Sequence, residues 1–406
     1  MQPYRLPHIN SNKYKIMEKR TSFILLLPLL FGFFVMGFVD VVGIATSYVR
    51  ADFSAELPAQ YFGFLPSVVL IWFLIFSIPT SLLMNRIGRK NTVLLSVLIT
   101  FLGMLIPFTE YNLITCLVGF AFLGIGNTIL QVSLMPLLTN VVSAERLAGV
   151  STCGQAVKAV SSFLGPFVAL FAATYFGSWQ YIFSIFGGIT LIFGIWLYFS
   201  KIERENVNAE ISLGSALKVL CNKAILPLFF GIVAVVGIDM GMNMGSPMLV
   251  MERLGLDPSL QTSVERVALV SSVYFACRTI GAFVGTALLA KMSAVLYFRL
   301  HIILGLLVLV GMFFAQSEIG ILILIGAMGY SISGIFSVIF SIALNSCPNK
   351  ENEISGLMIT AVFGGAILPP MMTFSSDVIG SQNGAICVLG LALIYLLYCA
   401  FTAKKA

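Results

Sequence analysis

Charged residues are scarce in this chain of 406 residues. Asp, Glu, Lys and Arg make up 10% of it, whereas an ordinary soluble domain carries roughly 25%. Hydrophobic residues make up 59%, and the mean hydropathy is +1.00, more apolar surface than a soluble core can bury. Apolar segments of about 20 residues match the hydrocarbon thickness of a bilayer. The composition therefore predicts an all-α polytopic membrane protein whose surroundings are lipid.

Several catalytic motifs are also missing. The sequence has no GxxxxGK[ST] phosphate loop, no HExxH zinc motif and no clustered nucleophile and base, so it predicts neither an ATP-driven pump nor an enzyme. The seven cysteines show no metal-ligand or disulfide spacing, and we expect no cofactor and no metal. The net charge of +6 follows from membrane topology and does not indicate a nucleic-acid partner.

Twelve apolar segments follow one another along the chain, and each should be helical because lipid offers the backbone no hydrogen-bond partners. We predict them at 22–48, 61–84, 91–109, 112–141, 149–174, 180–200, 224–251, 267–290, 297–316, 319–346, 354–376 and 383–402. The longest internal polar stretch separates two groups of six. The predicted organisation is a tail at 1–20, a six-helix bundle at 21–200, a linker at 201–223, a second bundle at 224–402 and a tail at 403–406.

The distribution of basic residues predicts the orientation. With the N-terminus inside, 18 of the 23 Lys and Arg residues fall in cytoplasmic segments, three in outer loops and two inside helices. We therefore expect a multi-pass protein of the cell inner (plasma) membrane with both termini in the cytoplasm. Met17 is a second candidate start within the predicted N-terminal tail.

Four charged residues lie deep inside apolar segments: Asp40, Lys158, Asp239 and Arg278. A charge near the bilayer centre costs at least ~2.5–3.5 kcal/mol, so such residues usually face a cavity or a partner. They could be static ion pairs that hold helices together, or they could form a cavity site for substrate and protons, which we favour. We expect Asp40 and Asp239 to carry protons, with Lys158 as the partner of Asp40.

Polar residues recur at helical spacing, which places them on one face of their segments. Such stripes occur on several predicted helices, and together they predict a polar lumen. The candidate substrate-binding residues on these stripes are Asn127, Gln131, Gln155, Lys158, Asn243, Tyr274 and Arg278.

The surroundings of the two acids resemble each other. Asp40 lies in GFVDVVGI and Asp239 in VGIDMGMN, and each belongs to the first segment of its group of six. Six-helix halves related by an axis along the membrane normal, with substrate bound between them, describe one large class of transporters. The two acids would then lie at equivalent places around one cavity.

The stretch SLLMNRIGRKN at 81–91 resembles the GxxxDRxGRK motif of the major facilitator superfamily. The last four defined positions match, whereas a serine replaces the first glycine and Asn85 replaces the aspartate. The resemblance implies two pseudo-symmetric six-helix bundles, and it predicts a weaker cytoplasmic latch because the acid is missing. The gating motif that it implies consists of Asn85, Arg86, Gly88, Arg89 and Lys90.

Three further stretches resemble the fucose permease branch of that superfamily, which consists of sugar–proton symporters. They are GIGNTILQVSLMPL at 124–137, GIFSVIFSIAL at 334–344 and FGGAILPP at 363–370. The resemblance puts a glutamate tied to proton coupling where this chain has Gln131, which does not titrate. Asp40 also lies about one helical turn before the acid of the branch's first helix.

These features predict a monomeric secondary transporter that imports a sugar together with protons by alternating access. Two alternatives stay open. One is a carrier of an organic or sugar acid anion that uses Lys158 and Arg278, and the other is a proton–drug antiporter with a lone acid for cations. A non-transporting sensor is the alternative from another class, and no appended signalling domain supports it.

Overall fold

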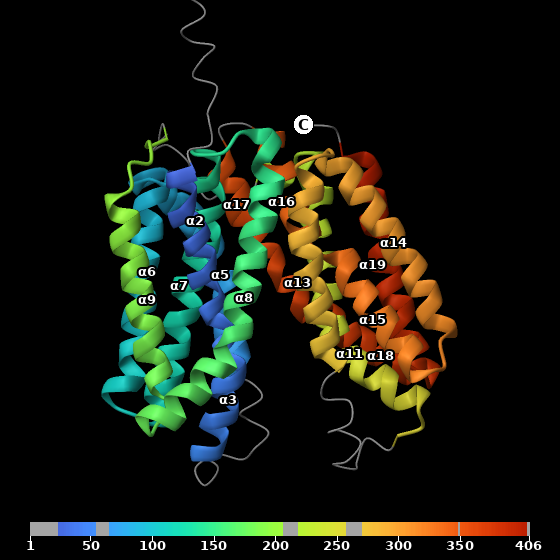
Figure 1. Ribbon diagram of the computed structural model, residues 1–406. Helices are drawn as coiled ribbons and strands as arrows, with labels where there is room; N and C mark the ends of the chain where they lie inside the picture. Colours follow the sequence, from blue (N-terminus) through green and yellow to red (C-terminus); the bar gives the residue numbers. More distant parts are fainter. Residues whose placement is uncertain (1–22, 54–64, 206–217, 257–269, 348–349, 404–406) are drawn as a thin grey trace, which may run out of the picture.

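The structure is a computed structural model that describes residues 23–53, 65–205, 218–256, 270–347 and 350–403 (Figure 1). The predicted tail at 1–20 lies outside these ranges, as do 206–217 of the predicted linker and 404–406. The helices are α2 (Phe23–Met36), η1 (Gly37–Asp40), α3 (Val41–Asp52), α5 (Leu65–Ile87), α6 (Arg89–Thr109), α7 (Leu113–Thr139), α8 (Ala144–Phe176), α9 (Tyr181–Phe199), α11 (Ile225–Arg253), α13 (Val270–Leu289), α14 (Ala294–Phe314), α15 (Glu318–Ile332), α16 (Ile335–Ser346), α17 (Glu351–Thr360), η2 (Ala361–Ala366), α18 (Leu368–Ile379) and α19 (Asn383–Thr402).

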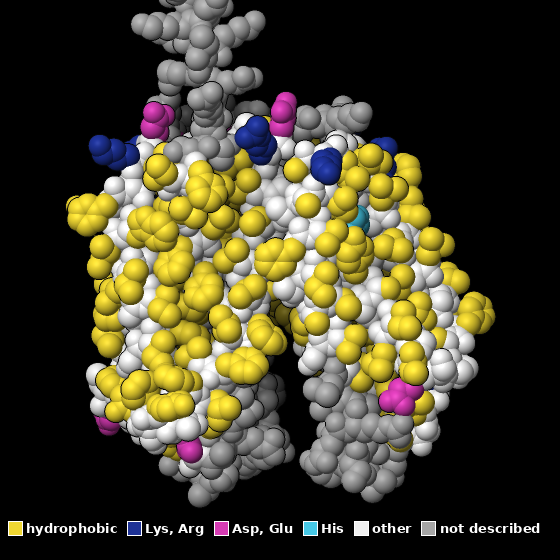
Figure 2. All heavy atoms as spheres, in the orientation of Figure 1, with side chains coloured by type: hydrophobic (Ala, Val, Ile, Leu, Met, Phe, Trp, Pro, Cys, Tyr) yellow, Lys and Arg dark blue, Asp and Glu magenta, His cyan; other side chains and the backbone are white. Residues whose placement is uncertain are grey.

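Twelve helical spans in the described ranges are long and apolar enough to cross a bilayer, which confirms the predicted number. Figure 2 shows apolar side chains over the flanks of the molecule and Lys and Arg side chains gathered at one end. We call this end the basic end; it includes the turn between α5 and α6 at Gly88 and the start of α17 at Glu351. An apolar flank between polar ends is the surface that a bilayer requires.

The helices form two halves, α2 to α9 and α11 to α19 (Figure 1). At the basic end α17 packs against α5 and α7, and the starting turns of α8 pack against α13 and α16. The halves diverge toward the opposite end, where Figure 2 shows a cleft between them. The structure is therefore closed at the basic end and open at the other.

The first span is not the continuous helix that the sequence predicted at 22–48. The 3-10 turn η1 interrupts it between α2 and α3. A Cβ added at Gly37 would lie 2.7 Å from the carbonyl oxygen of Lys158 on α8, so only glycine allows this close approach. The next residue, Phe38, is buried and stacks on Phe186 with ring centroids 4.0 Å apart. A 3-10 stretch inside a longer helix often marks a functional hinge, and Asp40 lies in this one.

The tenth and eleventh spans are also interrupted. The tenth breaks between α15 and α16 at Gly334, whose φ of +74° suits glycine, and the hydroxyl of Tyr297 donates to the freed carbonyl of Ser333 over 2.9 Å. The eleventh contains η2, where a Cβ added at Gly364 would lie 2.4 Å from the carbonyl oxygen of Val233 on α11. Irregular backbone at membrane depth is tolerated where protein surrounds it.

Candidate functional site

Asp40 ends the turn η1, and its side chain is exposed. The Oγ of Ser162 on α8 donates to Asp40 Oδ2 over 2.5 Å. The same hydroxyl lies 3.0 Å from the carbonyl oxygen of Lys158, one turn earlier. The acid of the first half is therefore exposed and hydrogen-bonded by a hydroxyl of α8.

Lys158 does not pair with Asp40 as the sequence predicted. Its side chain is half-buried on α8 and forms no ion pair with the residues that the structure describes. The close approach of Gly37 to the Lys158 carbonyl and to Ser161 brings the backbone of this stretch of α8 against the first span. The hydroxyl of Ser162 reaches the acid there instead.

The acid and the base of the second half are paired with each other. Arg278 Nη2 on α13 donates to Asp239 Oδ2 on α11 over 2.6 Å, and the contact is also an ion pair. Tyr274 is fully buried one turn before Arg278, and its hydroxyl donates to Asp239 Oδ1 over 2.6 Å. Three candidate residues from two helices therefore form one cluster. In this conformation its acid is held by a cation and a phenol.

Arg278 also lies near the first half. The carboxylate of Asp40 is close enough to act electrostatically on the Arg278 guanidinium. The side chain of Arg278 is 33% exposed and that of Asp239 is 15% exposed. The Nε of Arg278 is buried and has no hydrogen-bond partner within the described ranges. An acid of one half and a base of the other thus interact across the boundary between the halves.

The candidate amides lie on three helices. Asn127 and Gln131 on α7 are buried, whereas Gln155 on α8 and Asn243 on α11 are half-buried. Asn127 Nδ2 has no hydrogen-bond partner within the described ranges. Leaving a buried amide unsatisfied costs roughly 1–3 kcal/mol, which suggests that a ligand or a water binds it. No hydrogen bond in the described chain joins Asn127, Gln131 and Gln155, and their joint role stays a prediction.

Arg89 of the predicted gating motif is buried at the start of α6, with 5% of its surface exposed, and is not a solvated anchor. Its Nη1 lies 3.0 Å from the carbonyl oxygen of Pro136, 2.8 Å from Thr139 Oγ1 and 2.7 Å from Asn140 Oδ1. These acceptors surround the end of α7. The guanidinium is therefore fixed within its own half.

The same guanidinium crosses to the other half. Its Nη2 forms an ion pair with Glu351 Oε2 over 3.2 Å, and its Nε donates to Asn352 Oδ1 over 2.7 Å. Both partners lie at the start of α17. Because one rigid fork of donors binds both halves, Arg89 is a central contact of the closed basic end.

Asn85 retains a cross-half contact although the motif's acid is missing. Asn352 Nδ2 donates to Asn85 Oδ1 over 2.6 Å, and Asn85 Nδ2 donates to Glu353 Oε1 over 3.3 Å. All three side chains are buried. The sequence predicted a weaker latch because an aspartate is replaced, and the structure instead places an acid on the facing helix.

The rest of the motif shapes the turn between α5 and α6. Gly88 has a φ of +88°, which favours glycine. Lys90 Nζ donates to the carbonyl oxygens of Tyr198 and Ser200, over 2.9 and 2.7 Å. Arg86 is exposed. Arg89 and Asn85 thus contact the second half, whereas Lys90 ties the turn to the end of α9.

The linker contributes a residue that the sequence did not single out. Glu205 Oε1 accepts from the backbone N of Arg89 over 2.6 Å, and Glu205 Oε2 accepts from Asn140 Nδ2 over 2.9 Å. Glu351, Asn352 and Glu353 were missed as well. The only signal was an acid–amide–acid run at the start of an apolar segment, and such a run usually indicates a solvated helix end.

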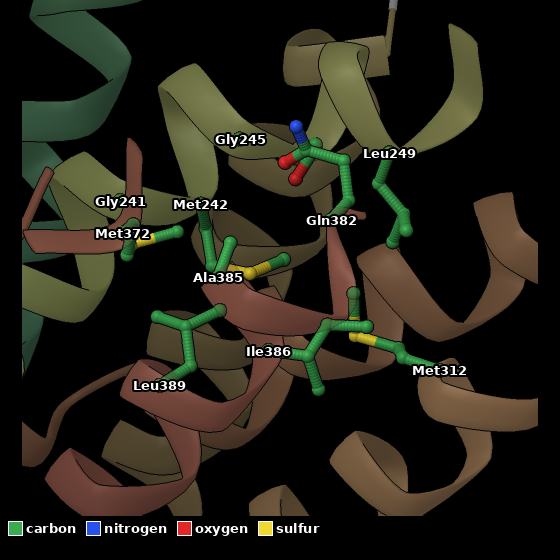
Figure 3. Close-up of a pocket in the computed structure, with 11 residues that line it drawn as sticks. Gly241, Met242, Gly245, Leu249, Met312, Met372, Gln382, Ala385, Ile386 and Leu389 are labelled. Carbon is green, nitrogen blue, oxygen red and sulfur yellow. The ribbon is translucent and has the colours of Figure 1, made fainter. Parts of the chain in front are cut away.

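Figure 3 shows a cavity inside the second half, lined by Met242 of α11, Met312 of α14, Met372 of α18 and Ile386 of α19. Its volume is about 10 Å³, enough for roughly one water molecule. Small-molecule sites begin at roughly 300 Å³. The cavity is therefore too small for a transported solute.

Twelve spanning helices in two halves, which charged and polar side chains join at the basic end, are the architecture of a membrane transporter. The sequence profile of the Major Facilitator Superfamily matches residues 28–370, and this protein belongs to that family. Among curated proteins, none matches its sequence.

Three solved proteins are similar in fold. FucP in an outward conformation has a TM-score of 0.82 at 16% identity, covering 95% of this chain and 100% of that one. A second FucP structure, that of a single-residue variant of the E. coli fucose:proton symporter, has a TM-score of 0.79 at the same identity and covers 95% and 98%. This similarity extends over both halves.

The other two proteins share the fold at lower similarity. A bacterial homologue of the iron transporter ferroportin, in an outward-facing state, has a TM-score of 0.73 at 12% identity and covers 93% of this chain and 98% of that one. The proton:xylose symporter XylE has a TM-score of 0.66 at 15% identity and covers 94% and 96%. At these identities the similarity shows the fold alone.

Proposed function

We propose that this protein imports a neutral sugar together with protons, by alternating access around a cavity between its halves. The observation that carries the proposal is the unequal state of the two membrane acids. Asp239 is held by Arg278 and Tyr274, whereas Asp40 is exposed and held by Ser162. Asp40 is then the acid available to take a proton from water in the cleft, whereas Asp239 neutralises the charge of Arg278.

Charge balance supports a neutral substrate. The four membrane charges are two acids and two bases, and Arg278 is already compensated by Asp239. Sugar hydroxyls are recognised by a few well-placed polar groups beside apolar surface, and the amides of Asn127, Gln131 and Gln155 are groups of this kind. The similarity to FucP, a fucose:proton symporter, and to XylE, a proton:xylose symporter, agrees with this class.

Arg278 links the proton to the conformational change in this proposal. When the cleft closes, Asp40 and Arg278 approach each other. An ionised Asp40 then competes with Asp239 for the guanidinium, whereas a protonated Asp40 does not, because a neutral acid has no charge to offer. Whether Arg278 bridges the halves therefore depends on the protonation of Asp40. Because this contact forms in only one protonation state, it shifts the equilibrium between the two conformations.

The orientation follows from the basic residues. We place the basic end and both chain termini in the cytoplasm of the inner (plasma) membrane. The contacts of α17 with α5 and α7 then close the cytoplasmic side, and the cleft faces the outside, where it takes up substrate. FucP and the ferroportin homologue are both described in outward states. We further propose that the monomer is the transporting unit.

Uptake by purified protein in proteoliposomes, with an imposed inward proton gradient, tests the proposal. The panel contains neutral monosaccharides, sugar acids and drug-like cations. We expect accumulation of a neutral sugar and loss of that accumulation in Asp40→Asn, with sugar exchange between the two sides retained. Asp377→Asn, which makes the same change at an exposed position of α18, is the matched control. Sugar accumulation with intact proton uptake in Asp40→Asn would refute the role of Asp40.

One observation favours a second candidate, the carrier of an organic or sugar acid. Lys158 is half-buried and has no carboxylate partner within the described ranges, so it could bind the carboxylate of a substrate. The same uptake panel with Lys158→Gln separates the candidates. Neutral-sugar uptake that survives the change supports the first, and sugar-acid uptake that disappears supports the second.

A further inference from the structure

Glu353 is a buried acid at the closed basic end. We call the contacts of α17 with α5 and α7 at this end the gate. Only 3% of its surface is exposed, and its carboxyl accepts a hydrogen bond of 3.3 Å from Asn85 Nδ2 on the facing helix α5. No Lys or Arg of the described chain lies within 4.0 Å of it, because Arg89 pairs with Glu351 instead. A buried ionised carboxyl without a cation is costly, and the neutral acid avoids that cost.

The direction of the hydrogen bonds around Glu353 is fixed by Arg89, which can only donate. Because Arg89 Nε donates to Asn352 Oδ1, the amide nitrogen of Asn352 faces Asn85 Oδ1. The amide nitrogen of Asn85 must then face Glu353. Glu353 therefore accepts from this side-chain amide and from its own backbone N–H, and both donors are neutral. A protonated carboxyl can still accept through its carbonyl oxygen.

The charged groups that act on Glu353 are few. They are Arg89 from α6 and Lys350 and Glu351 at the start of its own helix, and Glu351 has the same charge as Glu353. The facing helix α5 offers the neutral amide of Asn85. The other packed elements α7, α16 and η2 contain no charged residue, and α11, which also packs against α17, has charged residues only from Asp239 onward. The surroundings thus contain no dedicated counter-ion.

We propose that Glu353 is a second proton-binding residue, which holds a proton while the gate is closed and releases it to cytoplasmic water when the gate opens. The proposal rests on the alternating access proposed above, because it needs the halves to separate at the basic end. Separation of α17 from α5 exposes the carboxyl, which then ionises. Since the closed gate binds the extra proton, low pH at the basic end stabilises closure and rising pH favours opening.

This role also explains why residue 85 is an amide. An aspartate there would put a carboxylate oxygen where Asn85 Nδ2 now lies, 3.3 Å from Glu353 Oε1, and two carboxylates that close do not both ionise readily. With Asn85, the acid of this contact is Glu353 alone, and it belongs to α17 and not to the turn between α5 and α6. The strength of the contact between α17 and α5 then depends on whether Glu353 is protonated.

The test measures gate opening directly. Ser81→Cys places a reporter thiol on α5 where Ser81 is fully buried beside Gly356 of α17, and it removes only an intrahelical bond to Ile78. The full-length protein in nanodiscs is treated with a maleimide between pH 5 and pH 8. Mass spectrometry of the residue-81 peptide gives the labelling rate, divided at each pH by that of the exposed native Cys221.

We expect this normalised rate to rise with pH by up to about tenfold per pH unit, the limit for one linked proton. In Glu353→Gln, which keeps an acceptor for Asn85 but does not ionise, the rate should stay low and flat. Asp377→Asn, which neutralises an exposed acid of α18 away from these contacts, should keep the rise. The proposal is overturned by a flat profile in the protein that carries only Ser81→Cys, or by a rise that persists when Glu353→Gln is added.

A reciprocal exchange keeps the proposal testable if Glu353→Gln alone folds poorly. Asn85→Asp should raise labelling at neutral pH, because it adds a like charge, and Asn85→Asp combined with Glu353→Gln should lower it again. A double variant as open as Asn85→Asp would contradict the direct contact.

The labelling needs no substrate and no gradient. If sugar uptake is absent while the pH-dependent rise remains, including in Asp40→Asn, the transport proposal fails and the gate proposal stands. If sugar uptake is present without the rise, the gate proposal fails and the transport proposal stands.

Discussion

The guanidinium of Arg278 and the carboxylate of Asp239 meet at 2.6 Å on neighbouring helices of one half, with Tyr274 completing the cluster. Each partner satisfies the other, so removing one leaves a charge that is desolvated and unpaired. The two side chains are 33% and 15% exposed, which limits the energy of the pair but does not remove it.

A double-mutant cycle measures this pair. Arg278→Gln and Asp239→Asn should each lower the thermal unfolding midpoint of the detergent-purified protein, and the double variant should be less destabilised than the sum of the two. We expect a coupling of roughly 0.5–3 kcal/mol, the range for residues in direct contact. Strictly additive midpoints would show that the pair contributes no coupling.

Arg89→Lys should open the basic end. A lysine keeps the charge but loses the planar fork that binds the end of α7 and α17 together, so the change is not conservative. Losing one hydrogen bond to a charged group costs about 1.5–3 kcal/mol, which corresponds to at least about tenfold more of the opened form. Labelling of the Ser81→Cys reporter measures it, and Arg86→Lys at the neighbouring exposed position should have no effect.

Gly364→Ala should destabilise the second half. The new Cβ would lie 2.4 Å from the carbonyl oxygen of Val233, closer than any side-chain carbon tolerates, and backbone has to move. Overpacking of this kind costs roughly 1–3 kcal/mol. Gly188→Ala on α9, where a Cβ would meet nothing within 4 Å, is the matched control. Equal thermal midpoints for the two variants would argue against the tight packing of η2 on α11.

Tyr297→Phe should loosen the break of the tenth span. Its hydroxyl satisfies the Ser333 carbonyl where α15 ends, and a buried carbonyl left without that donor costs about 1–3 kcal/mol. Hydrogen exchange of the peptide that spans the break should become faster. Tyr398→Phe, at an exposed tyrosine of α19, should leave the exchange unchanged. Unchanged exchange in Tyr297→Phe would mean that this hydroxyl does not support the break.

The number and order of the spans could be predicted from the sequence because lipid forces each crossing segment to be long, apolar and helical. The breaks at η1 and η2 could not, because they depend on which backbone a glycine approaches. Gly37 meets the Lys158 carbonyl and Gly364 the Val233 carbonyl, and these partners lie 121 and 131 residues away along the chain.

The charged residues of the candidate site could be found because a charge inside an apolar run is conspicuous, but their partners could not. Ser162 holds Asp40 where Lys158 was expected, since the close packing at Gly37 determines which group of α8 reaches the acid. Glu353 went unnoticed because an acid at the start of a helix is usually solvated. Its burial results from the docking of α17 on α5, which belongs to the tertiary structure.

Glu205 marks the point up to which the chain between the two halves is bonded to the first half. Its carboxylate holds the backbone of Arg89 and the side chain of Asn140, so the chain from the end of α9 to residue 205 moves with the first half. Residues inserted before Glu205 would pull it from the gate, whereas residues inserted after it would lengthen the tether to α11 and leave the gate intact. A single carboxylate thus separates the part of the connection that belongs to the gate from the part that only joins the two halves.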